Sequence, residues 1–273
     1  MANNGGEMSS GQIFGELSNT QRVWAVASIH GEAERLVALH EALWPRAEPG
    51  DRLVYLGNMI GRGAACGETL DELLGFRTAF LTLEPSIEEQ VVFLRGGQEE
   101  MWQKLLQLQF ATDPRAVLEW MLQQGVGATL ETYGFDPEEA RRVAGSGTVG
   151  LTRWTQSLRS RIQSRPGHYE FMGSIRRAAY TEDHSLLFVH SGFDPSRPLE
   201  TQRDSFWWSS NGFATLEEPY SSYRRVVRGF EKNHPGLVME DYTLTLDGGC
   251  GFGGPLLAAC LLPDGQVVDM LEV

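Results

Sequence analysis

The chain is poor in cysteine and in basic residues, and it contains no long hydrophobic run. Its three cysteines form no C-x-x-C pair, which argues against a disulfide framework and favours a reducing compartment, the cytoplasm. No apolar stretch approaches the roughly 18 residues that a membrane-spanning helix requires, so we expect no membrane partner. Acidic residues outnumber basic ones and give a net charge of −13. Because this charge repels polyanions, we expect no nucleic-acid partner.

Common catalytic signatures are absent as well. The sequence has no G-x-S-x-G nucleophile elbow, no phosphate-binding P-loop and no dinucleotide fingerprint. Residues 1–20 are rich in asparagine, glycine and serine and lack both a basic start and an apolar core. They predict a flexible leader rather than a signal peptide. The chain as a whole is 41% hydrophobic and 10% aromatic, which is ordinary for a globular protein with a full core.

Short apolar runs alternate with helical patterns in the first hundred residues. The runs at 23–27, 53–56 and 91–94 predict buried strands, and each run leads into a glycine-containing loop. The periodicity between them predicts helices over 32–43 and 69–80. This β-α-β-α-β order predicts an α/β layer fold, in which ligand-binding residues gather at the carboxyl ends of the strands.

The middle of the chain changes character. Residues 98–165 place their apolar side chains at helical spacings, which predicts a helical insertion that ends at Pro166 and Gly167. Strand-like runs return later in the chain, at 186–189, 223–227, 243–246, 256–262 and 267–271. The Pro263-Asp264-Gly265 segment predicts a hairpin turn between the last two runs. These patterns predict a single domain over 21–273, a two-sheet α/β sandwich flanked by helices.

Seven segments of this chain form a recognisable series. Those after the early strands are Ala27-Ser28-Ile29-His30-Gly31, Gly57-Asn58-Met59-Ile60-Gly61-Arg62-Gly63 and Arg95-Gly96-Gly97-Gln98-Glu99. Those further along are Trp120 to Gly134, Phe188 to Pro195, Leu199 to Trp208 and Asp247 to Leu256. In their order and spacing they resemble the motifs of the calcineurin-like metallophosphoesterases, closest to the bacterial serine/threonine protein phosphatase and diadenosine tetraphosphatase branch. The resemblance covers nearly the whole chain and implies the two-sheet sandwich of that family.

The resemblance also implies where metal ligands would stand. The corresponding positions in this chain are Ser28, His30, Asn58, Gly97, His190 and Phe230. Only His30 and His190 keep the ligand type of the family, and no carboxylate remains. The family's chemistry uses two cations about 3.5–4 Å apart, which need anionic ligands to offset their repulsion. We therefore expect no metal here. His234 is expected at the surface, with replacement of the lost histidine ligand as the alternative.

The residues implied for proton transfer and phosphate clamping are replaced too. The family histidine that protonates the leaving group is Gln98 here, and the aspartate that orients it is Gly61. An arginine that clamps the phosphate is Ser210. A glutamine side chain has no proton that titrates near neutral pH. We expect none of these degenerate positions to be catalytic.

Two arginines and two histidines of the motifs remain. Arg62 and Arg95 match arginines of the second and third motifs, and with His30 and His190 they are candidates for anion binding. Two alternatives stay open: Arg62 can pair with Glu99 or a nearby backbone carbonyl, and the histidines can be remnants held by hydrogen bonds. If the histidines do take part, anion binding should weaken as they lose protons above about pH 6.5.

These replacements predict a pseudophosphatase that acts by binding, as a regulator, a scaffold or a sensor of a phosphorylated ligand. We expect a protein partner and no cofactor. One alternative is a divergent, active serine/threonine or dinucleoside-polyphosphate phosphoesterase with a reduced site for manganese, zinc or iron. A second alternative is a purely structural subunit.

Overall fold

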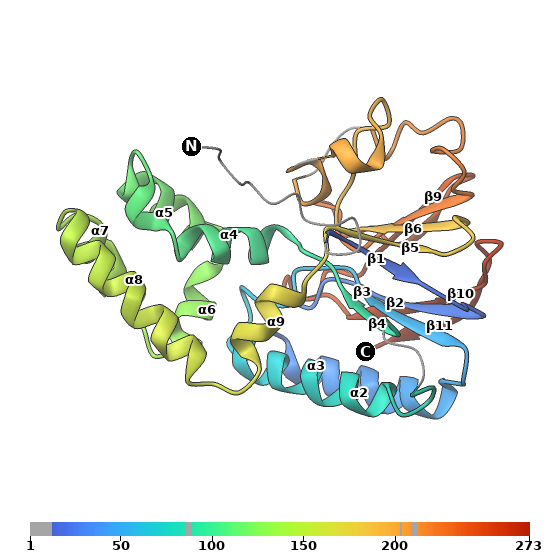
Figure 1. Cartoon of the computed structure of the whole chain (residues 1–273), viewed down its shortest axis with the longest axis horizontal. Helices are drawn as coiled ribbons and strands as arrows, with labels where there is room; N and C mark the ends of the chain where they lie inside the picture. Colours follow the sequence, from blue (N-terminus) through green and yellow to red (C-terminus); the bar gives the residue numbers. More distant parts are fainter. Residues whose placement is uncertain (1–12, 86–88, 203, 209–211) are drawn as a thin grey trace, which may run out of the picture.

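The computed structural model describes residues 13–85, 89–202, 204–208 and 212–273. Two β-sheets pack on one another, and helices α2 (Ala33–Leu43) and α3 (Cys66–Phe80) cover the outer face of one sheet (Figure 1). Further helices form a lobe to one side of the sheets (Figure 1). The predicted two-sheet α/β sandwich flanked by helices is confirmed.

The five-stranded sheet has the order β11-β10-β2-β3-β4. Its strands are β2 (Arg22–Val26), β3 (Asp51–Tyr55), β4 (Val91–Phe93), β10 (Leu257–Leu261) and β11 (Val267–Glu272). β2, β3 and β4 run parallel, whereas β10 lies antiparallel to both β2 and β11. Each of these strands coincides with a predicted apolar run. β3, β4 and β10 are buried along their whole length, as continuous apolar runs predict for strands covered on both faces.

The six-stranded sheet has the order β1-β5-β6-β7-β9-β8. Its strands are β1 (Phe14–Leu17), β5 (Ala178–Thr181), β6 (Leu186–Val189), β7 (Arg225–Arg228), β8 (Gly236–Met239) and β9 (Thr243–Asp247). The expected flexible leader over 1–20 is wrong for its last part, because β1 pairs in parallel with β5 and buries Phe14 and Leu17. Residues 1–12 lie outside the described residues.

The insertion after β4 is helical, and the helical region continues beyond its predicted end. Its helices are α4 (Gly97–Leu105), α5 (Pro114–Gln123), α6 (Val126–Thr132), α7 (Pro137–Ala144), α8 (Thr148–Gln163) and α9 (His168–Ser174). Short 3-10 helices are η1 (Trp44–Arg46), η2 (Leu108–Phe110), η3 (Leu199–Thr201) and η4 (Asp204–Phe206). Gly167 does not end the helical region, because its left-handed backbone (φ 79°) places it as the N-cap of α9.

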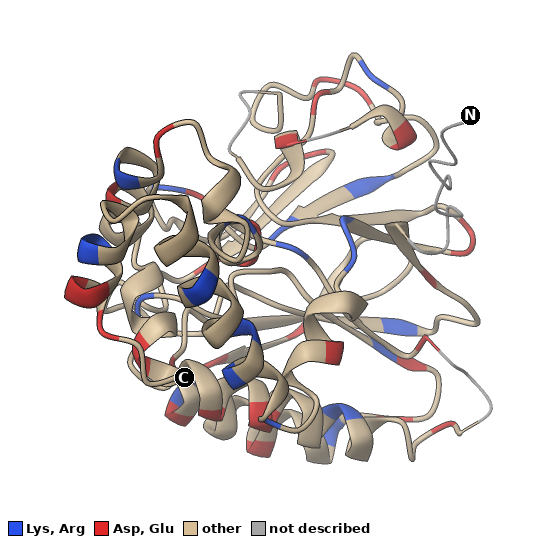
Figure 2. Ribbon diagram, turned by 60° about the vertical axis from the view of Figure 1, so that its left-hand side comes forward, with Lys and Arg blue, Asp and Glu red and all other residues tan. Residues whose placement is uncertain are grey.

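The lobe and the sheets share one hydrophobic core. Leu118 of α5 and Leu158 of α8 belong to the same buried cluster as Val26 of β2 and Val54 of β3. A smaller cluster, which includes Phe193 and several other aromatic residues, lies around the six-stranded sheet. Acidic and basic positions are interspersed along the helices (Figure 2). None of the helices in the described parts of the chain has the length and apolar character needed to span a bilayer.

Candidate functional site

Loops that follow strands of both sheets meet at one edge of the sandwich. Hydrogen bonds join them: His30 N to Asn58 O (2.7 Å), Ser28 Oγ to Gly229 O (3.0 Å), Phe230 N to His190 O (3.0 Å) and Gln98 N to Asn58 Oδ1 (2.9 Å). The structure thus brings together the positions that the motifs marked, namely Ser28, His30, Asn58, Gln98, His190 and Phe230. This edge is where open α/β sheets place their ligand-binding residues.

The loops after β2 and β3 carry unusual backbone geometry. His30, Asn58 and Arg62 have φ values of 56°, 53° and 62°, in the left-handed region. Non-glycine residues rarely adopt this conformation, although asparagine tolerates it better than histidine or arginine. Such strain persists where the surrounding structure holds the backbone, and it clusters at functional sites. The surrounding structure therefore holds these three residues in a conformation that they rarely adopt.

Asn58 stands where the family resemblance implies the bridging aspartate. Both the oxygen and the nitrogen of its side-chain amide have a hydrogen-bond partner. Its Oδ1 accepts a hydrogen bond from the backbone N–H of Gln98, so its Nδ2 faces His30 Nε2 at 3.4 Å. Because the amide nitrogen can only donate, Nε2 of His30 accepts and its proton lies on Nδ1. Nδ1 is buried and has no hydrogen-bond partner among the described residues. The imidazole contacts the rings of Phe230 and Phe252 edge to face, with centroid distances of 6.0 and 5.3 Å, and those two rings also contact each other at 6.4 Å.

His190 is buried beneath the ring of Phe230. Its Nδ1 donates to Leu56 O at 2.7 Å, and the two rings are stacked, with centroids 5.5 Å apart and 16° between their planes. Burial lowers the pKa of His190 to about 4 and lowers the pKa of His30 well below its usual 6.5. Both imidazoles are therefore already neutral at pH 6.5. The expected loss of anion affinity above that pH, through deprotonation of these histidines, is wrong.

His234 belongs to the same aromatic cluster. Its ring centroid lies 4.2 Å from that of Phe252 and 5.7 Å from that of Phe230. Its Nδ1 is 2.8 Å from Oδ2 of Asp247, a carboxylate that is 1% exposed. His234 is thus partly buried and bound to Asp247, and not fully at the surface as we expected. Sequence reasoning missed Phe252 as a site residue, although it lies within the motif that follows β9.

Gln98 occupies the space that an aspartate at position 61 would need. Gly61 has a left-handed backbone (φ 86°), and a Cβ added there would lie 2.1 Å from Gln98 Oε1. The amide of Gln98 instead donates from Nε2 to the backbone O of Gln124 at 2.8 Å. This bond ties the start of α4 to the end of α5. A side chain at position 61 would therefore require Gln98 to move.

Glu99 is fully buried and binds backbone rather than arginine. Its carboxylate accepts hydrogen bonds from the backbone N–H groups of Asn58, Met59, Ile60 and Gly96. These bonds hold the loop after β3 against the start of α4. No ion pair joins Arg62 to Glu99, so that alternative for Arg62 is wrong.

Trp208 covers the position where the family has an asparagine ligand. A Cβ added to Gly97 would lie 3.0 Å from Cζ3 of the Trp208 indole, closer than side chains normally approach. A longer side chain at position 97 therefore requires Trp208 to move. Ser210, the replaced phosphate clamp, lies outside the described residues.

Arg62 and Arg95 do not share one site. The guanidinium of Arg62 lies 4.0 Å from the centroid of the Phe252 ring and forms no ion pair with any residue in the described part of the chain. Arg95 pairs with Glu100 at 2.9 Å and lines a separate pocket of about 350 Å³. Arg95 therefore does not join the predicted anion-binding group, whereas Arg62 stays beside His30 through Phe252.

Comparison with known structures agrees with this architecture. A protein assigned as a diadenosine tetraphosphatase superposes with a TM-score of 0.56 at 18% identity, over 95% of this chain and 97% of the other. A serine/threonine protein phosphatase from Saccharomyces cerevisiae, with similarity to a human phosphatase, gives 0.51 at 13% identity, over 96% and 82%. The fold is that of the calcineurin-like phosphoesterases. No protein-family profile and no curated protein sequence matches the chain.

The side chains at the metal positions of this phosphoesterase fold do not suit a two-metal centre. Such a centre requires a bridging carboxylate, and Asn58 supplies only an amide that is already bound on both sides. Among the six metal positions only His190 retains the geometry of a ligand, because a bond from Nδ1 to a carbonyl leaves the Nε2 lone pair free. His234 has the same arrangement, with its Nδ1 bound to Asp247, so its replacement of the lost histidine stays an alternative. Among the described residues, no group of three or more His, Cys, Asp or Glu side chains is placed to hold a metal. We therefore derive no reaction step through a metal.

Proposed function

We propose that this chain is a pseudophosphatase, a phosphoesterase fold that acts by binding rather than by two-metal hydrolysis. The observation that carries the proposal is the pair of replacements at Asn58 and Phe230. The first provides a neutral amide where a bridging carboxylate is needed, and the second stacks a phenyl ring on His190. In this proposal the chain serves as a regulator, a scaffold or a sensor of a phosphorylated ligand.

The electrostatics support this proposal. Two divalent cations about 3.5 Å apart repel by roughly 19 kcal/mol at an effective dielectric constant of about 20. Neutral imidazoles and amides cannot offset that repulsion as two carboxylates would. The leaving group would also lack an acid, because Gln98 does not titrate and its amide is bound to Gln124.

A hydrolysis assay tests the proposal. The purified chain is incubated with p-nitrophenyl phosphate, phosphopeptides and dinucleoside polyphosphates in the presence of manganese, zinc or iron. We expect no turnover above that of an Asn58→Ala, His190→Ala variant prepared in the same way. Turnover well above this control would overturn the proposal and favour a divergent phosphoesterase with a reduced metal site. The free lone pair of His190 is the observation that favours that second candidate.

The ligand that we propose for the former active site is an anion held by Arg62. Support comes from its guanidinium, which has no acidic partner among the described residues, and from Glu99, which is fully buried and engaged by backbone N–H groups. A charge-assisted contact of this kind contributes a few kcal/mol, so we expect affinities in the micromolar to millimolar range. Calorimetric titration with inorganic phosphate should show binding that Arg62→Ala abolishes. No binding below about 10 mM, or no effect of the variant, would contradict this assignment.

A protein partner and a cytoplasmic location complete the proposal. The three cysteines are free and buried, as in proteins of a reducing compartment. A purely structural subunit would bind a partner protein but not phosphate, and Arg62→Ala would leave that complex unchanged.

A further inference from the structure

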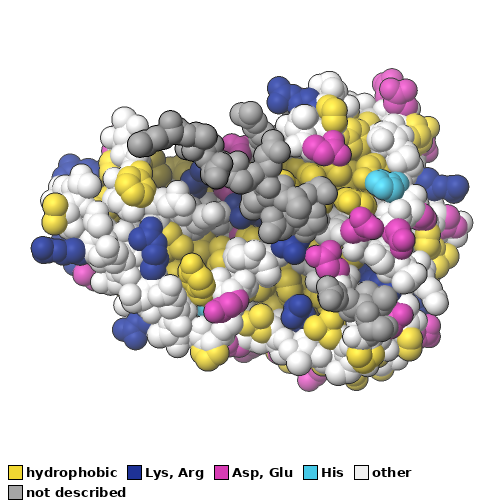
Figure 3. Space-filling model, in the orientation of Figure 1, with side chains coloured by type: hydrophobic (Ala, Val, Ile, Leu, Met, Phe, Trp, Pro, Cys, Tyr) yellow, Lys and Arg dark blue, Asp and Glu magenta, His cyan; other side chains and the backbone are white. Residues whose placement is uncertain are grey.

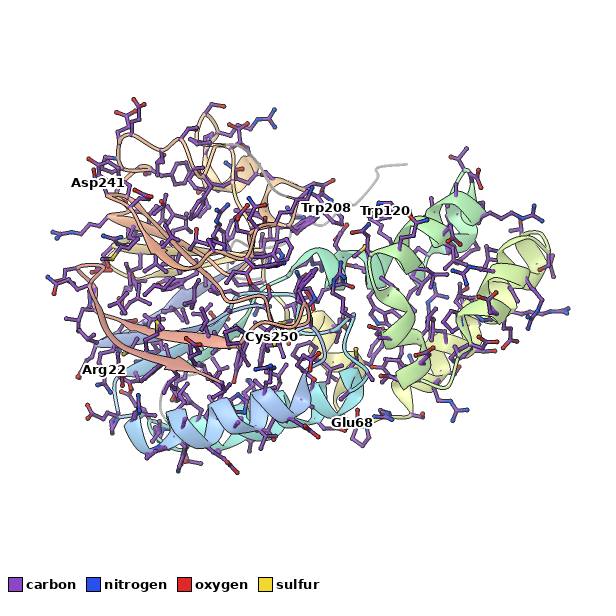
Figure 4. All side chains as sticks on the ribbon, turned by 180° about the vertical axis from the view of Figure 1, so that it is seen from behind. Arg22, Glu68, Trp120, Trp208, Asp241 and Cys250 are labelled. Carbon is purple, nitrogen blue, oxygen red and sulfur yellow. The ribbon has the colours of Figure 1, made fainter. Side chains whose placement is uncertain are left out.

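Three large aromatic side chains are exposed around the former active site. Trp120, Trp208 and Phe252 are 43%, 37% and 42% exposed. Trp120 and Trp208 contact each other edge to face with ring centroids 5.7 Å apart, and Figure 4 shows them side by side where the helical lobe meets the sheets. Figure 3 shows hydrophobic side chains reaching the surface in several places in the orientation of Figure 1. Tryptophan and arginine are the residues that most often carry the binding energy of protein interfaces.

Contacts within the loops beneath connect the Trp120–Trp208 pair to the Arg62–Phe252 pair. Trp208 packs over Gly97, whose neighbour Gln98 donates to the backbone O of Gln124, one helical turn after Trp120. Gly125 follows directly, and its carbonyl accepts from the N–H of Arg62 at 2.9 Å. The Arg62 guanidinium in turn lies over the ring of Phe252. We call Trp120, Trp208, Phe252 and Arg62 the tryptophan–arginine surface.

The charge on this surface has a sign opposite to that of the protein. Arg62 is a cation without an acidic partner in the described part of the chain, in a protein whose net charge is −13. The nearest motif carboxylate, Glu99, is fully buried and bound to backbone N–H groups. The polar side chains beside Arg62 are the amides of Gln98 and Asn58. An anionic group of a partner therefore meets one attractive charge here and no carboxylate from the loop after β3, residues 56–65, while Glu32 and Glu231 in the loops after β2 and β7 are partly exposed.

We propose that the tryptophan–arginine surface docks a peptide segment of a partner protein. The segment places a bulky apolar side chain against the Trp120–Trp208 pair and an anionic side chain, carboxylate or phosphate, on Arg62. A nucleic acid or an anionic membrane fits less well, because both need several cations and both are repelled by a net charge of −13. The proposal rests on the proposed function and names the chemistry of the partner. The contact with the Trp120–Trp208 pair does not depend on whether the chain hydrolyses phosphate esters.

Synthetic peptides test the proposal directly. The probes are fluorescent peptides with one leucine or tryptophan and one glutamate or phosphoserine, separated by one to six residues. A matched series carries lysine in place of the anionic residue. Fluorescence anisotropy with the full chain should reveal at least one spacing for which the anionic peptide binds better than its lysine counterpart.

The variants separate the two halves of the surface. For the best peptide, Trp120→Ala and Trp208→Ala should each weaken binding about tenfold or more, as expected for interface tryptophans. Arg62→Ala should remove the preference for the anionic peptide over the lysine peptide. The control is Phe110→Ala, which removes an 81% exposed ring from η2 and should change nothing.

Two results would overturn this inference. One is a peptide series in which no spacing favours the anion, and the other is a Trp120→Ala variant that behaves like Phe110→Ala. A chain that binds inorganic phosphate but none of the peptides would leave the proposed anion site standing and reject the docking surface. Concentration-dependent self-association lost with Trp120→Ala would mean that a second copy of the chain occupies the surface, and would equally reject a foreign peptide.

Discussion

The ring of Phe230 lies parallel to the imidazole of His190, with centroids 5.5 Å apart and 16° between the planes. Phe230 stands where the resemblance to phosphoesterases implies a histidine ligand. A phenyl ring keeps the flat shape of the imidazole but has no lone pair to donate. The position has therefore changed from a metal ligand to part of an apolar cover, which also includes Phe252 over His30. This relationship leads to the following predictions.

Manganese should leave the stability of this chain unchanged. A metal stabilises a folded protein by about 2.7 kcal/mol when its concentration is a hundredfold above the dissociation constant. Differential scanning fluorimetry with about 1 mM manganese, and separately with EDTA, should give the same melting temperature. A Ser28→Asp, Asn58→Asp, Phe230→His variant is the positive control, because it restores anionic and imidazole ligands. A shift of several degrees for the natural chain would show that a working metal site survives.

Acid should destabilise the protein partly through His190. In the unfolded chain its pKa returns to about 6.5, whereas burial holds it at about 4 in the folded protein. As the pH falls, the unfolded state therefore binds the proton first. The folded protein keeps its full stability above pH 6.5, and loses stability through His190 as the pH falls towards 4. Between pH 7.5 and 5 this one residue should remove about 2 kcal/mol from the free energy of unfolding.

Urea unfolding at pH 7.5 and pH 5.0 measures this loss. A His190→Gln variant should lose correspondingly less stability between the two values, whatever its stability at pH 7.5. The matched control is His184→Gln, which removes an exposed histidine. This variant should lose as much stability between the two pH values as the natural chain does. An equal loss in the natural chain and in His190→Gln would contradict the prediction.

Glu99→Gln should destabilise the fold more than most single substitutions. The carboxylate accepts backbone N–H bonds from both the loop after β3 and the start of α4, and it is fully buried. In glutamine, an NH2 group replaces one acceptor oxygen and faces these N–H groups. This mismatch should lower the free energy of unfolding by about 2–4 kcal/mol. Glu119→Gln, in an exposed ion pair with Arg141, is the control and should cost little. Similar losses for both variants, from urea unfolding, would refute the special role of Glu99.

The fold could be predicted where strands carry continuous apolar runs. β2, β3 and β4 each bury such a run, and the glycine-containing loop after each marks its end. Three strands were not predicted, because their sequences carry no clear strand pattern. β1 is short and follows a glycine-rich segment, β5 has only four residues, and β8 is an edge strand with a half-exposed pattern. Their strand conformation depends on pairing with distant partners, which a local pattern does not encode.

The candidate site, like the fold, could be predicted only in part. The order of the motifs placed His30, Asn58 and His190 together, since loops after neighbouring strands meet at one sheet edge. The motifs did not predict that Arg95 turns away to Glu100, or that Trp208 packs over Gly97. Those contacts depend on side-chain packing between segments that are far apart in the sequence. The neutral state of the histidines likewise follows from burial, which no motif specifies.

The contact between Gly97 and Trp208 gives the last prediction. Gly97→Asn restores the residue type that the family resemblance implies, but its Cβ would lie 3.0 Å from the indole. The indole must then move, so we expect a loss of about 1–3 kcal/mol, as for other overpacked sites, and a shift of tryptophan fluorescence. Gly127→Ala is the control, because a Cβ there meets its nearest atom at 3.5 Å within α6 and should be neutral or slightly stabilising.

A double-mutant cycle decides whether the clash is the cause. Trp208→Ala removes the indole, so Gly97→Asn should cost much less in that background than in the natural chain, with a coupling free energy of about 1 kcal/mol or more. If the asparagine costs the same with and without Trp208, the loss comes from the backbone of α4 instead. The glycine would then have no connection with the indole. If the coupling is found, an asparagine at position 97 and the present placement of Trp208 exclude each other, and restoring that one ligand would require removing the tryptophan as well.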